Sequence, residues 1–130
     1  MTETGIPNEV LEFISDHIAS MEQIEVLLLL SSRPEQEWTV EKVFGQIQSS
    51  PASVLVRLRE FCDRGLLIEK PNQLYQYSPR NEKLAHAVRL LALTYKERRI
   101  KIIELIYRQP TDSVQSFADA FKLRKDKPNA

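Results

Sequence analysis

Few residues in this sequence of 130 could carry out catalysis or hold a metal ion. The sequence contains one cysteine, Cys62, and two histidines, His17 and His86, which are far apart along the chain. An ordinary structural zinc site takes four cysteine or histidine ligands. Three glycines leave no room for a glycine-rich phosphate loop, and no nucleophile motif is present. We therefore predict no enzymatic activity, no metal site and no cofactor.

Charge is unevenly distributed along the chain, although the formal net charge is zero. Residues 1–41 hold nine acidic residues and one basic residue, whereas residues 42–130 hold nine acidic and seventeen basic residues. Such a split favours an anionic partner for the second part of the chain. The alternative is that the acidic segment pairs with the basic residues inside the fold, and the sequence leaves both open.

The segment from Ser50 to Arg64 has the pattern of an amphipathic helix. Ser50 is a good N-cap and Pro51 suits the first helical position. At 100° per residue, five residues fall within about 120° of one another and predict a core-facing arc: Val54, Leu55, Leu58, Phe61 and Cys62. The opposite arc carries Ala52, Ser53, Val56, Glu60, Asp63 and Arg64, with Arg57 and Arg59 flanking it. Cys62 is therefore expected to be a packed, unreactive thiol.

Shorter elements are predicted on both sides of this helix. Asn8 is expected to cap a helix over 9–19, Ser20 to begin a second one that ends near Ser31, and Thr39 to cap a third. Trp38 is expected to form a single extended step. Gly65 should end the central helix, and the residues after it predict a hairpin with strands over 66–68 and 74–78 and a turn over 70–73.

A long helix is predicted over 81–108, where apolar residues recur in alternating steps of four and three. It would be roughly 40 Å long. A second apolar line follows its other side, so the helix needs two surfaces to cover it, one of them from a second copy of the chain. A short helix is predicted over 113–121, followed by a basic tail. The expected dimer interface comprises Leu91, Leu93, Tyr95, Ile100, Ile103, Tyr107, Phe117 and Phe121.

The order of three helices, a glycine and two strands joined by a turn is that of a winged helix. The segments Ser50–Val54, Leu58–Phe61 and Gly65–Leu67 resemble the recognition helix and wing entry of MarR-like transcriptional regulators, and Tyr75–Pro79 resembles the end of their second wing strand. The helix after the wing is also similar to the dimerisation helix of the PadR group, which is the second family that the chain resembles. The resemblance covers about residues 20–108.

The resemblance implies a homodimer that binds double-stranded DNA and regulates transcription, with the helix over about 50–64 in the major groove. Serine hydroxyls and helix N-terminal amides suit phosphate oxygens, and arginine suits guanine or phosphate. The residues expected to contact DNA are Ser49, Ser50, Ala52, Ser53, Val56, Arg57, Arg59 and Gln73. The residues identify no small-molecule effector.

The predicted fold class is mainly α with a small β-hairpin wing, a winged helix-turn-helix followed by a long C-terminal dimerisation helix. We expect a flexible N-terminus over 1–8, an N-terminal helix over 9–19, a winged-helix domain over 20–79, the long dimerisation helix over 80–108, and a short helix with a basic tail over 109–130. Without a basic, apolar leader or an apolar run of about 18 residues, a cytoplasmic protein with no membrane contact is expected.

A second function stays open at this point. The expected hairpin turn offers Lys70, Asn72 and Gln73 but no arginine, and Glu60 and Asp63 lie toward the far end of the recognition helix. A winged helix with this composition could instead be a protein–protein interaction module without specific DNA binding. Such a module would dock a partner through Val56 and the wing residues Tyr75 and Tyr77.

Overall fold

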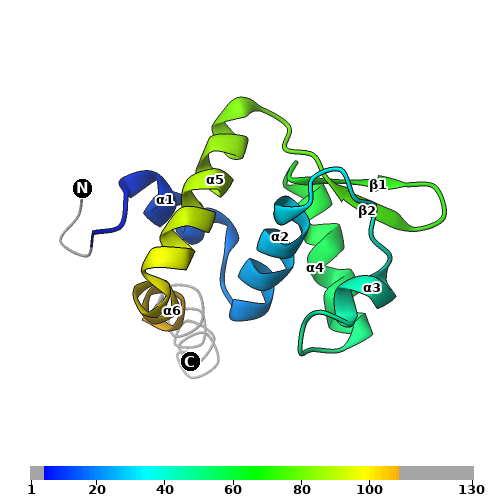
Figure 1. Ribbon diagram of the computed structural model, residues 1–130, viewed down its shortest axis with the longest axis horizontal. Coiled ribbons are helices and arrows are strands. Elements are labelled where there is room, and N and C mark those ends of the chain that lie inside the picture. The colour runs from blue at the N-terminus through cyan, green and yellow to red at the C-terminus, as the bar shows by residue number, and fades with distance from the viewer. Residues whose placement is uncertain (1–4, 109–130) are drawn as a thin grey trace, which may run out of the picture.

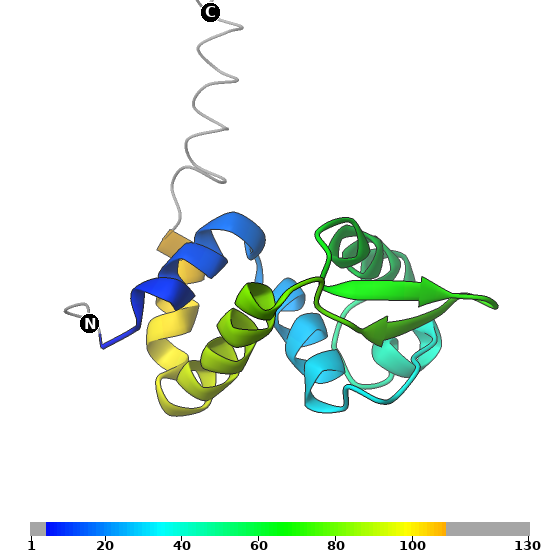
Figure 2. The same cartoon turned by 90° about the horizontal axis from the view of Figure 1, so that it is seen from above.

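The computed structural model describes residues 5–108, which form a helical body with a hairpin projecting at one end (Figures 1 and 2). The expectations for residues 1–4 and 109–130, including Phe117 and Phe121, lie outside the described residues. The elements follow in the order α1 (Asn8–His17), α2 (Met21–Ser32), α3 (Val40–Phe44), α4 (Pro51–Asp63), β1 (Leu67–Lys70), β2 (Leu74–Tyr77), α5 (Glu82–Glu97) and α6 (Arg99–Arg108).

Helix starts agree with the capping signals at three positions and differ at one. The hydroxyls of Ser20, Thr39 and Ser50 each accept a hydrogen bond from the backbone N–H three residues further on, at 3.1–3.2 Å. Each therefore satisfies one of the free N–H groups of its helix, as predicted. The prediction that Asn8 caps α1 was wrong. Pro7 is the N-cap, it makes no side-chain cap, and Asn8 is already helical.

The core lies around α2, which contacts α4, α5 and β2. Val26, Leu27 and Leu30 on this helix are fully buried, because its apolar residues point to more than one side and other elements cover each side. Helix α2 is thus packed between other elements of the fold.

The wing is an antiparallel hairpin in which Leu67 pairs with Tyr77 and Lys70 with Leu74. Strand β1 covers Leu67–Lys70, whereas the prediction was 66–68. Strand β2 covers Leu74–Tyr77, one residue shorter than the predicted 74–78. Trp38 forms the expected single extended step. Its backbone exchanges two hydrogen bonds with Tyr75, at 2.7 and 2.8 Å, and so adds a third, one-residue strand to the hairpin.

Gly65 connects the recognition helix to the wing through a left-handed turn. Its φ is +77°, a conformation that glycine adopts without steric cost. The N–H of Leu66 donates to the carbonyl of Phe61 at 2.9 Å, and the N–H of Gly65 donates to that of Cys62 at 3.1 Å. These two bonds form a Schellman motif, which ends α4 and directs the chain into β1.

The prediction of one continuous helix over 81–108 was wrong. The helix stops at Glu97, Arg98 has φ −135° and ψ 50°, and α6 starts at Arg99 in a new direction. Figure 1 shows α5 across the view, whereas α6 is seen nearly along its axis. The break brings Ile102 and Ile106 into the core, with 0% and 4% of their surfaces exposed. Burial of these two side chains outweighs the intrinsic helical preference of the residues around Arg98.

Candidate nucleic-acid interface

Helix α4 is held by one apolar face and presents its other face outward. Val54, Leu58 and Phe61 are fully buried, and the helix contacts α2, α3 and β1. Its N-terminal end points away from the core, with Ser50, Ala52 and Val56 exposed. The scaffold therefore fixes the orientation of this helix, while its first turns are open to a partner.

Three of the residues predicted to contact DNA converge on one carboxylate, that of Glu22 at the start of α2. The hydroxyl of Ser49 donates to Oε2, and the hydroxyl of Ser53 donates to Oε1 at 2.7 Å. The Nε of Arg57 donates to the same Oε1 at 2.9 Å. This role of Glu22 was not predicted, because nothing in residue types or spacing indicates which of the nine acidic residues in 1–41 faces α4.

The environment of Glu22 favours its ionised form. Burial alone would raise the pKa of this carboxyl, but hydrogen bonds from Ser49, Ser53 and Arg57 outweigh burial and hold the pKa below its ordinary value. The pKa of the Arg57 guanidinium is raised in turn, since contacts with Glu22 and Glu60 outweigh its own burial. Both side chains are therefore charged at neutral pH.

Three other predicted residues lie beside the wing, and Ser50 and Val56 are exposed on α4 and its N-cap. Ala52, Arg59 and Gln73 line a hollow of about 330 Å³ between α3, α4 and the hairpin. Gln73 is exposed at the hairpin turn, where it and Asn72 both have positive φ. Of the predicted residues, Ser49, Ser53 and Arg57 are therefore bound to Glu22, whereas Ala52, Arg59 and Gln73 line an open hollow beside the wing.

The wing has little free positive charge. Lys70, the basic residue nearest its turn, donates to Glu37 at 2.9 Å, and Gln76 donates to the carbonyl of Pro34 at 3.0 Å. Tyr75, one of the residues through which a protein-docking module would bind, is fully buried, and Tyr77 is half-buried. The prediction that Tyr75 belongs to a docking surface on the wing was therefore wrong, because this side chain is inside the core.

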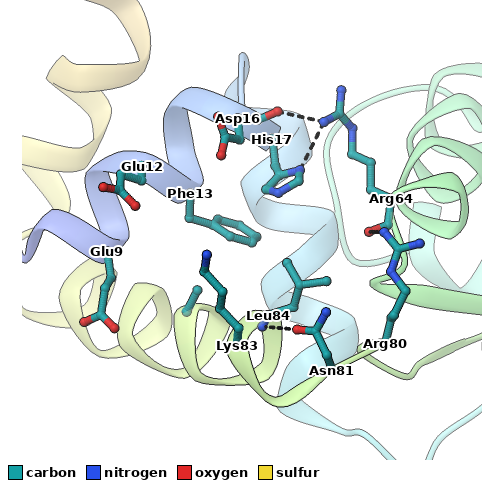
Figure 3. A pocket seen from close by; sticks show the side chains of 11 residues that line it. Glu9, Glu12, Phe13, Asp16, His17, Arg64, Arg80, Asn81, Lys83 and Leu84 are labelled. Carbon is teal, nitrogen blue, oxygen red and sulfur yellow. Dashed lines mark hydrogen bonds between the residues drawn. The ribbon is translucent and has the colours of Figure 1, made fainter.

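A second hollow, of about 330 Å³, lies between α1, the end of α4 and the start of α5 (Figure 3). Glu9 and Glu12 of α1 lie on one side of this hollow, and Arg64 and Arg80 lie on the other. Arg64 donates to the carbonyl of Asp16 at 2.7 Å and lies 3.0 Å from the Nδ1 of His17, and so links α4 to α1. Burial, and then the positive charge of Arg64, lower the pKa of His17, which is therefore neutral at pH 7.

The residues predicted for the dimer interface differ widely in exposure. Leu93, Ile100 and Tyr107 are 56%, 65% and 75% exposed, large values for apolar side chains. Tyr95 and Ile103 are half-buried. The prediction for Leu91 was wrong, because this side chain is fully buried in the core of its own chain.

Cys62 and the acidic residues form no recognisable reactive centre in the part of the chain that the structure describes. No group of three or more His, Cys, Asp or Glu side chains is placed to hold a metal ion among residues 5–108. Burial, with the nearby charges of Glu69 and Asp63, raises the pKa of the Cys62 thiol to about 11. No helix within the same residues is long and apolar enough to cross a membrane.

Known structures resemble the chain, whereas no protein-family model and no curated protein matches its sequence. A MarR family transcriptional regulator from Streptomyces coelicolor is 20% identical, with a TM-score of 0.52 over 94% of this chain and 82% of that protein. A MarR family protein from Mycobacterium tuberculosis is 15% identical, with a TM-score of 0.49 over 95% and 84% of the two chains. The first likeness confirms the predicted MarR-type winged-helix fold.

Proposed function

We propose that this protein is a DNA-binding transcriptional regulator that inserts α4 into the major groove. The observation that carries the proposal is the exposed N-terminal part of α4, fixed by its buried face beside a hairpin, in a fold shared with a MarR family regulator. In winged helices of this kind the recognition helix reads base edges with its first turns. Ser50, Ala52, Val56 and Arg59 are exposed for such contacts.

The test is selection of binding sites from random-sequence duplex DNA, followed by titration over a salt series. We expect enrichment of a palindromic sequence and affinity that falls steeply with salt, because phosphate contacts release counterions. Arg59→Ala should lower the salt slope by about 1, as expected for the loss of one phosphate contact. Lys101→Ala is the matched control, since it removes one positive charge from α6, at the end of the molecule away from the wing (Figure 2).

Two outcomes would overturn this proposal. The absence of binding at low salt would leave the protein-interaction module as the alternative. Steep salt dependence without an enriched sequence would indicate a nonspecific architectural role instead.

We further propose that the regulator acts as a homodimer through α5 and α6. The proposal is supported by Leu93, Ile100 and Tyr107, three large side chains that α5 and α6 leave exposed to solvent. Two recognition helices would then meet half-sites about 34 Å apart on one face of the DNA.

Light scattering at micromolar concentration tests the dimer. We expect twice the chain mass of 15.1 kDa for the wild type, and the chain mass itself for Leu93→Asp combined with Ile100→Asp. Ile68→Asp, at an exposed apolar side chain on the wing, should remain dimeric. A wild-type protein with the mass of one chain would refute the dimer.

A further inference from the structure

The contacts of Arg57 on the outer part of α4 are unusual for a residue that is to bind an anion. Its guanidinium lies between two carboxylates, with Nε 2.9 Å from Glu22 Oε1 and Nη1 2.7 Å from Glu60 Oε1. The side chains of Arg57 and Glu22 are only 25% and 17% exposed, so water screens this ion pair less than a surface pair. One positive and two negative charges leave this cluster with a net charge of −1.

Both carboxylates are fixed by further hydrogen bonds. Glu22 also accepts from the hydroxyls of Ser49 and Ser53. Glu60 accepts from the amide of Gln23 at 3.1 Å, and the Gln23 side chain, which is almost fully buried, accepts from the backbone N–H of Ala19 at 2.5 Å. The guanidinium is therefore held in one orientation by a network that spans α2 and α4.

Arg57 keeps N–H groups for an external acceptor, including both of those on Nη2. Nε and Nη1 donate to the carboxylates, whereas Nη2 makes no hydrogen bond within residues 5–108. A base edge is an uncharged acceptor and requires a donor in the right place. A phosphate is an anion, and its sequence-independent attraction depends on the net positive charge that the protein presents. A donor inside a cluster of net charge −1 therefore favours the base edge over the phosphate.

We propose that Glu22, together with Glu60, sets the specificity of DNA recognition by screening Arg57 from phosphates while orienting it toward a base. This inference rests on the DNA binding proposed above. It makes Glu22 a positioning residue, which acts through Arg57 and raises the ratio of specific to nonspecific affinity.

The experiment compares Glu22→Gln with the wild type on the selected site and on random duplex DNA, over a salt series. Glutamine keeps an oxygen that accepts hydrogen bonds but removes the charge. Arg57 then becomes available to one more phosphate, and the salt slope on random DNA should rise by about 0.9. For each tenfold fall in salt concentration, the affinity of the variant for random DNA should therefore rise about eightfold more than that of the wild type. The ratio of specific to random affinity should fall accordingly.

Two further variants make the result specific to this cluster. Glu25→Gln removes the same charge one turn further along α2, where Glu25 makes no hydrogen bond or ion pair within the described residues, and should keep the wild-type slope. Glu60→Gln removes the more exposed carboxylate from Arg57 and should raise the slope as Glu22→Gln does. It serves as the test if Glu22→Gln lacks a cooperative thermal transition.

The outcomes separate this inference from the proposed function. If the wild type binds its selected site but neither Glu22→Gln nor Glu60→Gln changes the slope or the specificity ratio, the inference is overturned and the function stands. An equal rise in slope for Glu25→Gln would overturn it as well, because the effect would then be general electrostatics. If the wild type binds no DNA, it is the proposed function that fails.

Discussion

Replacing Gly65 by alanine should destabilise the fold, because this residue occupies the left-handed turn between α4 and the wing. At φ +77° an L-residue with a Cβ costs about 1–2 kcal/mol relative to glycine. The added Cβ would also lie 2.4 Å from Nε of Arg80, so that side chain must move. Moving it breaks the exposed hydrogen bond from Arg80 to the carbonyl of Arg64, worth about 0.5 kcal/mol. Gly65→Ala is thus expected to lower the free energy of unfolding by about 2 kcal/mol.

Gly45→Ala is the matched control for this substitution. Gly45 ends α3 with φ −64° and ψ −17°, which alanine adopts without strain, and the nearest atoms to an added Cβ lie at 3.5 Å. Alanine there reduces the conformational entropy of the unfolded chain and should stabilise the fold by about 0.4–1 kcal/mol. Gly65→Asn should fall between wild type and Gly65→Ala, because asparagine tolerates the left-handed region better than alanine does.

Urea and thermal unfolding followed by circular dichroism measure these differences. For a chain of this size, 2 kcal/mol corresponds to a decrease of roughly 8 °C in Tm. A change of less than about 0.5 kcal/mol for Gly65→Ala, or equal changes for the two alanine variants, would show that the turn geometry carries no such cost.

Three further predictions follow from burial and from the shifted pKa values. Leu91→Ala should lower the free energy of unfolding by about 2–5 kcal/mol in urea titrations, whereas Leu93→Ala, whose side chain is 56% exposed, should change it by less than about 0.5 kcal/mol. With a pKa of about 11, only about one-thousandth of Cys62 should be thiolate at pH 8. Its reaction with a disulfide reagent should therefore be slow in the folded protein and fast after unfolding. Fast labelling of the folded chain would contradict the burial of this thiol. Since the pKa of His17 is lower in the folded than in the unfolded chain, stability should fall as the pH drops below about 6.5, and His17→Gln should reduce that fall in urea titrations at several pH values.

The sequence predicts those features of the fold that depend on neighbouring residues. Ser20, Thr39 and Ser50 were recognised as caps because capping requires a particular side chain at a fixed distance from a helix start. Gly65 and the hairpin after it were recognised for the same local reason. The fold class followed from the order of these elements.

Features that depend on contacts between distant segments were not predicted. The break at Arg98 has no local signal, because no proline or glycine is present there and the gain comes from burying Ile102 and Ile106. The contact between Glu22 and Arg57 joins residues 35 positions apart in the sequence, and only the packing of α2 against α4 creates it. The candidate site was therefore predicted as a set of outward-facing side chains, without the carboxylate that binds three of them.

The one-residue strand at Trp38 gives the protein an optical probe of its own wing. Trp38 is the only tryptophan in the sequence, its side chain is 2% exposed, and its backbone is bonded to Tyr75 in β2. Its fluorescence therefore comes from a buried indole in a segment whose backbone is attached to the hairpin. Detachment of the wing would hydrate this indole and shift its emission to longer wavelength. Movement of the wing during binding can thus be followed in the unlabelled protein.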